Sequence, residues 1–536
     1  MEMNRRAFIT GTGAAIVAGS AIAATAASAD ETATEAAPST GLAESGYMDA
    51  SAADGMVPSF MQPPAPITDV ADTKSYDVVV VGAGASGLAA ALRACQEGAK
   101  VAVVQKQDGA VSQGFEATGL LSDKNDEATK AAFVSKAMEL SHYRPKRELL
   151  DAWAHNSGDA ILWFRDILDA AGVEVPAIED AGYDKDCDGY TAHFITARPT
   201  DTYAAAVPGV ADYAAGQGVD FYYSMPAVQL VKDGDAVTGV IAGAEGAYTR
   251  FDVAKGVILS TGDYQNNQEM LQFYLPDVYG FPPLVPGLTG DGHRMGVWAG
   301  GHLEPINHTK MIHETWSDNA PFLMVGPDGK RFCNEHLPWF EVNNLMRSLM
   351  KKNIDDPAKS RVFSVLDAKY QDQMQAWSEL DPDIKVKELP ELRNEPDNFF
   401  CVVFQGDTLE EAAAMVGLDA EALQQTVDRY NELVAQGADD DFGKNPGYLA
   451  PIDTPPFTLV WRDFNYGLSA VLGGLVVDEN NQVLGDDDAP IKGLYATGNV
   501  SGPFFGGIDY PMYFPGLSIG RAITTGYIAG AAAAHA

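Results

Sequence analysis

The chain has 536 residues, which is enough for roughly two to four structural units. Hydrophobic residues make up 46% of it, a share typical of globular rather than disordered proteins. It carries 36 Lys and Arg against 74 Asp and Glu, a net charge of −38, which repels nucleic acids and anionic lipid surfaces and argues against both as partners.

The N-terminal segment predicts export. Arg5 and Arg6 precede a weakly apolar run rich in Ala and Gly, which ends at Ala27-Ser28-Ala29. This resembles a twin-arginine signal, and its low hydrophobicity argues against the alternative of a transmembrane helix. Residues 30–74, rich in Ala, Ser, Thr, Pro and acidic side chains, are predicted to be a flexible linker. We therefore expect residues 1–29 to direct the folded protein to the periplasmic or extracytoplasmic side of the cell envelope.

A dinucleotide-binding motif follows the linker. Residues 77–81 form an apolar strand that leads into Gly82-x-Gly84-x-x-Gly87, then a helix to about residue 97 and a second strand over 101–104. The glycines allow a tight turn, close approach of a pyrophosphate, and packing of helix on strand. The first residues of the helix, Ala85 and Ser86, offer free N–H groups to the phosphates.

The ribose-binding acid expected after the second strand is missing. Gln105 stands in its place and is followed by Lys106. A glutamine amide can still hydrogen-bond ribose hydroxyls, although without charge assistance. The four cysteines form no C-x-x-C pair, and no metal site is predicted.

Several later motifs specify the cofactor as FAD. Two apolar strands end in Thr261-Gly262-Asp263 and Thr497-Gly498-Asn499, and the segments TGDGHRMGVWAGG, PDGKRFCNE and LGGLVVD lie between or beside them. Together with the N-terminal motif, these resemble the fumarate reductase/succinate dehydrogenase flavoprotein family over residues 75–536. The resemblance implies an α/β fold: a Rossmann-like FAD-binding domain (75–301 and 469–536) with an inserted α+β capping domain (302–468).

The same resemblance implies non-covalently bound FAD. Within the capping domain, Thr408 and Asp419 are predicted N-caps of two helices. The predicted cofactor-binding residues are Gly82, Gly84, Ala85, Ser86, Gly87, Gln105, Lys106, Ser112, Gly119, Thr261, Gly262, Gly498, Asn499, Leu517 and Ser518.

The charged groups with which fumarate reductases clamp a dicarboxylate have no counterpart here. Pro338 occupies the position matched to the proton-delivering arginine, and Ser469 or Ala470 that of a histidine. The second clamp arginine is replaced by the loop holding Tyr510 and Tyr513. A dicarboxylate in such a closed site would keep its desolvation cost of several kcal/mol per charge. We therefore expect a larger, mostly neutral, aromatic or polycyclic substrate.

The loop YPMYFPGLSIG resembles that of 3-ketosteroid dehydrogenases. The match implies that Tyr510 donates a hydrogen bond to a substrate carbonyl with the Gly516 N–H as its partner, and Tyr513 competes for the tyrosine role. The predicted reaction is ene chemistry: hydride transfer from flavin N5 to the C=C bond of an enone and a proton from a tyrosine, or the reverse. The helix starting near Leu517 would direct its positive end at the flavin.

Several alternatives remain open. The main one is reduction of an unsaturated monocarboxylate, with Arg294, Arg331 and Arg347 as carboxylate partners. A non-catalytic flavin electron carrier is a second, and an amine oxidase fits the motifs less well. For the exported reductase, a separate cytochrome or quinol-linked protein is expected to supply the electrons and to be the only link to a membrane. The resemblance also matches Glu314 to a glutamate that relays protons. His308 and His313 have no third partner for a metal and are expected to be structural, and Arg521 would reach the pyrophosphate or lie at the surface.

Overall fold

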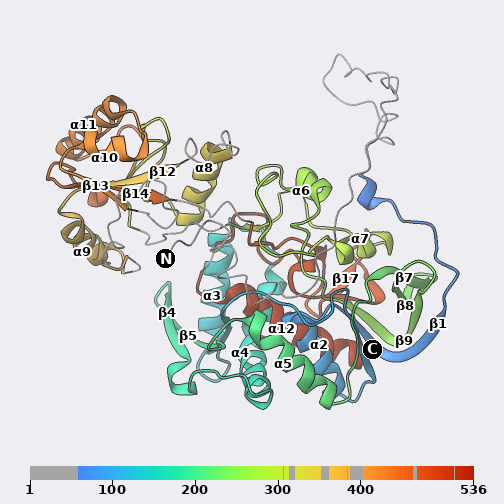
Figure 1. The fold of residues 1–536 in the computed structure, drawn as a ribbon. Helices are drawn as coiled ribbons and strands as arrows, with labels where there is room; N and C mark the ends of the chain where they lie inside the picture. The colour runs from blue at the N-terminus through green and yellow to red at the C-terminus, as the bar shows by residue number, and fades with distance from the viewer. Residues whose placement is uncertain are drawn as a thin grey trace, which may run out of the picture. The chain divides into compact units, whose positions relative to one another are not determined.

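The computed structural model describes residues 58–305, 307–312, 320–351, 361–382, 384–386, 403–462, 468–511 and 513–536. The chain divides into two units, Met1–Pro64 and Ala65–Ala536, and the strands and helices below all belong to the second (Figure 1). The predicted signal and most of the predicted linker lie outside the described residues. Among the described helices, none combines the length and hydrophobicity that crossing a membrane requires.

An eight-stranded mixed sheet forms the centre of the FAD-binding region. In sheet order its strands are β17 (Gln482–Leu484), β18 (Pro490–Ala496), β9 (Thr249–Leu259), β1 (Asp72–Val81), β2 (Val101–Val104) and β6 (Asp220–Tyr222), while β7 (Ala227–Asp233) and β8 (Ala236–Ala242) join through β9. Strands β18, β9, β1, β2 and β6 are parallel. Because β1 lies between β2 and β9, the strand order reverses there, which places a ligand crevice at the carboxyl ends of these strands.

Strand β1 is longer than predicted. It begins at Asp72 instead of residue 77, since its first half pairs with β9 from Asp72↔Thr249 onward. Ala71 also donates a backbone hydrogen bond to Tyr248. The predicted linker over residues 30–74 is therefore too long at its end, because residues 72–74 are part of the sheet.

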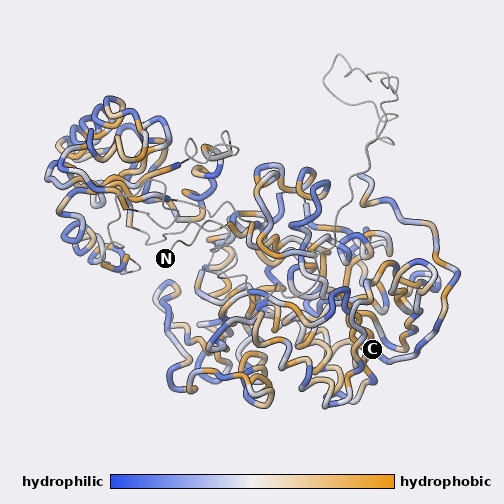
Figure 2. Tube along the Cα trace, in the orientation of Figure 1, coloured by the Kyte–Doolittle hydropathy of each residue, from blue (hydrophilic) through white to orange (hydrophobic). Residues whose placement is uncertain are grey.

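Helices cover this sheet, and α12 lies along α2 although the two are far apart in sequence (Figure 1). Many residues along α2 and α12 are hydrophobic (Figure 2). The helices of this region are α2 (Ala85–Gln96), α3 (Glu127–Leu140), α4 (Arg147–Ala170), α5 (Tyr203–Gly216), α6 (Gln268–Tyr274), α7 (Asp291–Trp298) and α12 (Leu517–Ala534). A three-stranded antiparallel sheet, β3 (Ala117–Leu120), β5 (Tyr190–Ala197) and β4 (Gly182–Cys187), packs on α4 and α12.

The region predicted as the capping domain has its own core. Its four-stranded antiparallel sheet runs β11 (Leu323–Val325), β12 (Val362–Leu366), β14 (Phe457–Arg462), β13 (Val403–Gly406). Its helices are α8 (Trp339–Lys351), α9 (Tyr370–Leu380), α10 (Leu409–Val416) and α11 (Ala420–Gln436). The side chains of Thr408 and Asp419 cap α10 and α11, as predicted.

Two short strand pairs lie outside these larger sheets. They are β10 (Lys310–Met311) with β15 (Ala470–Val471), and β16 (Leu475–Val476) with β19 (Ser501–Gly502). β19 follows η6 (Gly498–Val500), a short 3-10 turn at the end of β18. The C-terminal loop that holds Tyr510 lies beside β10 through a separate bridge between Lys310 and Asp509.

Candidate cofactor and substrate site

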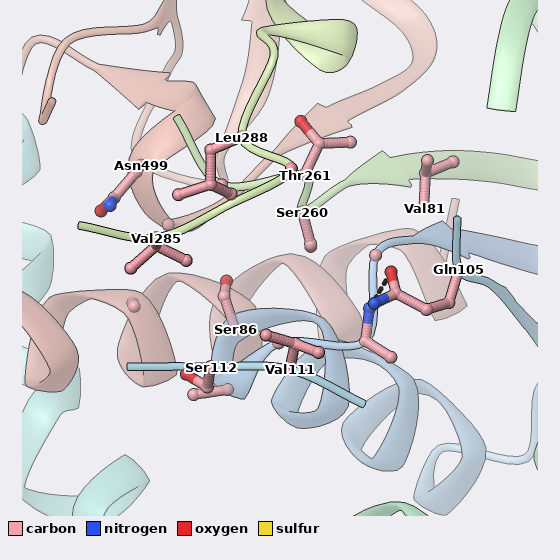
Figure 3. A pocket seen from close by; sticks show the side chains of 18 of the residues that line it. Val81, Ser86, Gln105, Val111, Ser112, Ser260, Thr261, Val285, Leu288 and Asn499 are labelled. Atoms are coloured by element: carbon pink, nitrogen blue, oxygen red, sulfur yellow. Dashed lines mark hydrogen bonds between the residues drawn. The ribbon is translucent and has the colours of Figure 1, made fainter. Parts of the chain in front are cut away.

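A cleft lies at the carboxyl ends of the parallel strands and encloses about 1040 Å³, part of it open to solvent. In Figure 3, Ser86, Val111 and Ser112 lie on the α2 side and face Val285 and Leu288 across the cleft. The predicted cofactor residues that line it are Gly82, Gly84, Ala85, Ser86, Gln105, Lys106, Ser112, Thr261, Gly262, Gly498, Asn499 and Ser518. The tertiary structure thus gathers most of the predicted set, from five segments, around one cleft.

Three predicted residues do not line this cleft. Gly87 faces the turn, where a Cβ atom would lie 2.0 Å from the Gly82 carbonyl oxygen. Gly119, in β3, packs against α4, where a Cβ atom would meet the Ser157 carbonyl oxygen at 2.3 Å. Leu517 is buried in the core at the start of α12. Their positions assign them to packing around the cleft rather than to its wall.

The cleft fits a dinucleotide. Gly82 has φ +108°, and a Cβ atom there would lie 2.3 Å from the Ser260 carbonyl oxygen. Helix α2 starts at Gly84 with no side chain capping its N-terminus, so its first N–H groups face the cleft at the positive end of the helix dipole. Anionic phosphates are the ligands that such a helix start binds best.

Hydroxyl side chains join the segments of the cleft wall. Thr497 Oγ1 lies 2.8 Å from Ser86 Oγ and 2.6 Å from Ser260 Oγ, which ties α2 to the ends of β9 and β18. Thr497 was noted only as part of a strand-end motif, and Ser260 was not among the predicted cofactor residues. Their position directly after two apolar strands was the signal that could have found them.

Gln105 and Lys106 are held by neighbouring residues as well as lining the cleft. The side-chain oxygen of Gln105 accepts a hydrogen bond from the Ala83 N–H at 3.4 Å (Figure 3). Its NH₂ group donates to Gln107 Oε1 and to the Gly109 carbonyl oxygen. Lys106 Nζ pairs with Asp291 at 2.8 Å and donates to Thr289. Gln105 therefore connects the Gly-rich turn to the loop after β2, a role that a carboxylate could not fill because it lacks donors.

A buried carboxyl group, Asp263, organises the far end of the cleft. It accepts hydrogen bonds from the backbone N–H groups of Gln265 and Val471 at 2.9 and 3.1 Å, and from Asn499 at 3.5 Å. Burial raises the pKa of Asp263 to about 6, although these donors oppose the shift. Asp263 thereby orients Asn499, a residue of the cleft wall. Asp263 is part of the Thr261-Gly262-Asp263 motif, but no role was predicted for it.

The two tyrosines of the C-terminal loop have different surroundings. The Tyr510 hydroxyl accepts a hydrogen bond from the Ser518 N–H at 3.1 Å, so the phenol lies at the N-terminus of α12, beside a cleft residue. Burial raises the pKa of Tyr510 above its ordinary value, so the phenol is protonated at neutral pH and able to donate. Gly516 forms the N-cap of α12 with φ +77°. The structure thus brings Tyr510 and Gly516 to the same helix start.

Tyr513 points elsewhere. Its hydroxyl donates to the Ala137 carbonyl oxygen at 2.9 Å and contacts Ser141 Oγ, both at the end of α3. The side chain is buried, and its phenol is satisfied by these partners. This environment matches that of a packing tyrosine.

Arg521 and His308 are held by hydrogen bonds within the protein. Arg521 is buried and donates from Nη2 to the Gly498 carbonyl and Ser501 Oγ, so it is neither at the surface nor in the cleft lining. His308 lies between Tyr264, at 2.7 Å, and the Glu304 carbonyl, at 2.9 Å. The described residues contain no cluster of three or more His, Cys, Asp or Glu suited to a metal. His313 and Glu314 lie outside the described residues.

The carboxyl group of Glu304 is buried, so it should make the stability of the protein depend on pH. Its carboxyl accepts from the Gly474 N–H at 2.8 Å, and burial, opposed by that bond and by Arg521, raises its pKa to about 8 from 4.5. The folded state thus keeps a proton that the unfolded state releases above pH 4.5. The stabilisation is complete below pH 4.5 and is lost as pH rises through 8, at up to about 1.4 kcal/mol per pH unit.

Glu304→Gln should remove this dependence, because the amide mimics the protonated carboxyl and keeps the acceptor for Gly474. We expect the unfolding free energy of the native protein to fall relative to that of Glu304→Gln between pH 5 and pH 8, measured by denaturant titration at each pH. A constant difference across this range would contradict the buried, protonated state of Glu304.

The fold belongs to the class of dinucleotide-binding α/β flavoproteins. A Gly-rich turn lies where the strand order reverses, the N-termini of α2 and α12 lie at the cleft, and the inserted region has a hydrophobic core of its own. Comparison with known proteins specifies it further: residues 77–510 match the family described as FAD binding domain, and the chain belongs to this family. It is an FAD-dependent oxidoreductase of the fumarate reductase/succinate dehydrogenase flavoprotein type. The predictions of fold class, FAD and an enzyme acting on CH–CH groups are confirmed at this level.

The relatives include enzymes with different named substrates. A vinyl phenol reductase of Lactiplantibacillus plantarum is 28% identical over 498 residues, covering 86% of this chain and 97% of that protein. A cytochrome-type fumarate reductase of Shewanella frigidimarina is 26% identical, covering 86% and 77%. The structure of a 3-ketosteroid Δ4-(5α)-dehydrogenase from Rhodococcus jostii superimposes with a TM-score of 0.61 at 21% identity, covering 87% and 98%, which shows a shared fold.

Proposed function

We propose that this protein is an ene-reductase that reduces the C=C bond of a mostly neutral, aromatic or steroid-like enone, or catalyses the reverse dehydrogenation. The cleft residues named above would hold FAD, which when bound supplies the hydride to the β-carbon. Tyr510 and the Gly516 N–H would hold the carbonyl oxygen as negative charge develops on it. Tyr510, kept protonated by burial, is the proposed proton donor, so that one hydride and one proton saturate the double bond.

One observation carries the choice of a neutral substrate: the arginines that could bind a carboxylate are already paired. Arg294 binds Asp291 at 2.6 Å, and Arg331 binds Glu335 and Asp439 at 2.8 and 2.7 Å. Arg347 binds Asp509 at 2.6 Å and Asp277 at 2.9 Å.

Freeing Arg331 or Arg347 for a substrate would break a buried ion pair, which costs several kcal/mol, whereas Asp291 would keep Lys106 as a partner if Arg294 were freed. Two of the relatives are named for substrates of these two types. A vinyl phenol is a neutral aromatic alkene, whereas fumarate is a dicarboxylate. The paired arginines favour the first type of substrate for this chain.

A set of matched electron acceptors tests this proposal. The holoprotein is photoreduced without oxygen, and the return of flavin absorbance is followed after adding benzalacetone, cinnamate, 4-vinylphenol or fumarate. We expect benzalacetone to reoxidise the flavin at least about 10²-fold faster than cinnamate, because an unpaired carboxylate pays its desolvation cost in the site. Faster reoxidation by cinnamate would favour the monocarboxylate reductase, and no response to any acceptor would favour the electron carrier.

We further propose that the protein is exported with FAD bound and receives electrons from a separate cytochrome or quinol-linked protein. The basis is Arg5-Arg6, followed by the weakly apolar run ending in Ala-x-Ala. Fractionation of cells that produce the native chain and an Arg5→Lys/Arg6→Lys variant tests this. Equal amounts of both outside the cytoplasm would contradict twin-arginine export.

A further inference from the structure

Four charged side chains, three of them buried, form a group that includes Asp509, the residue before Tyr510. Arg347, on α8, and Asp509, in the C-terminal loop, form a two-pronged ion pair: Nη1 to Oδ2 at 2.6 Å and Nη2 to Oδ1 at 2.8 Å. Arg347 is 1% exposed, and the Asp509 side chain 8%. Arg347 also binds Asp277, which follows α6. Planar guanidinium–carboxylate pairing of this kind fixes both direction and distance.

Lys310 completes the group. Its Nζ lies 3.1 Å from Asp277 Oδ2 and 3.4 Å from Asp509 Oδ1, and its side chain is 5% exposed. Two cations and two carboxylates therefore balance, three of them buried and the fourth, Asp277, with 37% of its side chain exposed. Removing one member leaves a net buried charge, whereas removing one of each sign keeps the group neutral.

The backbone transmits this arrangement to Tyr510. The Tyr510 N–H donates to the Lys310 carbonyl oxygen at 3.0 Å, and Lys310 and Asp509 form a β-bridge. The phenol then reaches Ser518 at the start of α12. Tyr510 is thus held in two ways. Its own N–H is bound to Lys310, and its neighbour Asp509 is fixed by the ion pair with Arg347.

We propose that Arg347 is a positioning residue for catalysis: through its ion pair with Asp509 it sets the location of the Tyr510 phenol, so that α8 of the inserted region determines proton transfer in the FAD-binding region. This inference rests on the proposed function for its rate effect, but not for its effect on the phenol. Arg347 takes no part in substrate binding, since its described donors serve Asp509, Asp277 and Asn344.

The first test reads the phenol directly. 3-Fluorotyrosine is placed at position 510 of the full chain, and its ¹⁹F chemical shift is compared in the native, Arg347→Gln and Arg331→Lys backgrounds. We expect the shift to move and broaden in Arg347→Gln. Arg331→Lys is the control, because the Arg331 side chain is also largely buried, at 6% exposed, and its partners Glu335 and Asp439 both belong to the inserted region. An unchanged signal in folded Arg347→Gln would overturn the proposal.

The second test uses the dependence on Tyr510. Arg347→Gln should slow reoxidation by the enone about 10- to 100-fold in the native background, a range expected for a misplaced catalytic group. In a Tyr510→Phe background it should cause no further loss. An equal loss in both backgrounds would show that Arg347 acts on stability alone and would overturn the proposal.

The charge balance supplies a third comparison that also guards against misfolding. The double variant Arg347→Gln/Asp509→Asn keeps the group neutral, so it should be more stable than either single variant. If the fluorine signal moves while Tyr510→Phe leaves the enone rate unchanged, the positioning role stands and the proposed role of Tyr510 fails. Strictly additive losses in the double variant would contradict the pairing.

Discussion

Tyr510→Phe should slow reoxidation of the reduced flavin by an enone about 10²- to 10³-fold, the loss measured elsewhere when one oxyanion donor is removed. The phenol lies at the N-terminus of α12, where it accepts from the Ser518 N–H, and burial keeps it protonated. Phenylalanine fills the same space without a donor. The measurement is single-turnover reoxidation by stopped flow, with FAD content checked by absorbance so that a loss of cofactor is not mistaken for a loss of chemistry.

Tyr513→Phe is the matched control for that experiment. Its hydroxyl donates to the Ala137 carbonyl and contacts Ser141, so its removal should cost about 1 kcal/mol of stability and leave the reoxidation rate unchanged. The opposite pattern, with a slow Tyr513→Phe and a normal Tyr510→Phe, would assign proton donation to Tyr513. A normal rate in both would remove the phenols from the mechanism.

Gly82→Ala should yield a protein that has lost its FAD and much of its stability. The new Cβ atom would lie 2.3 Å from the Ser260 carbonyl oxygen, a backbone atom that cannot move aside, and φ is +108°. The turn would have to open at the point where α2 meets the cleft. The ratio of flavin to protein absorbance and the melting temperature of the purified protein measure both effects.

Gly98→Ala separates the clash from the backbone strain. Gly98 also has a positive φ, +84°, but a Cβ atom there meets nothing within 4 Å, so only the strain of about 1–2 kcal/mol remains and FAD should be retained. If Gly82→Ala does not fold, Gly84→Ala offers a milder case, with a Cβ atom 3.2 Å from the Val111 carbonyl oxygen. Full flavin content in both Gly82→Ala and Gly84→Ala would contradict the fit of a dinucleotide to this turn.

Local features were predictable because their causes lie within a few residues. The strand over 101–104 occurs as predicted, since its apolar run is buried on both faces. Thr408 and Asp419 cap their helices because an N-cap needs only its own side chain and the N–H group three residues on. The Gly-rich turn combines a φ requirement with close packing, and both act at a single residue.

Pairings between distant segments were not predictable in the same way. Residues 72–74 look like linker until β9 provides the pairing partner that makes them a strand. Gln105 was expected to face a ribose, and its amide also binds the loop that follows it. Arg347 and Asp509 are 162 residues apart, and no pattern along the chain connects them.

The sequence by itself determined the class of fold and its cofactor, because periodicity, glycine spacing and strand-end motifs act over short stretches of chain. It also predicted that the loop holding Tyr510 lacks the arginine with which fumarate reductases clamp a dicarboxylate. Only the tertiary structure decided which tyrosine lies at the start of α12, and that the candidate arginines are already paired. Both depend on hydrogen-bond and ion-pair partners that only folding brings together. The energies of such contacts are set by burial and distance, which the order of residues does not reveal.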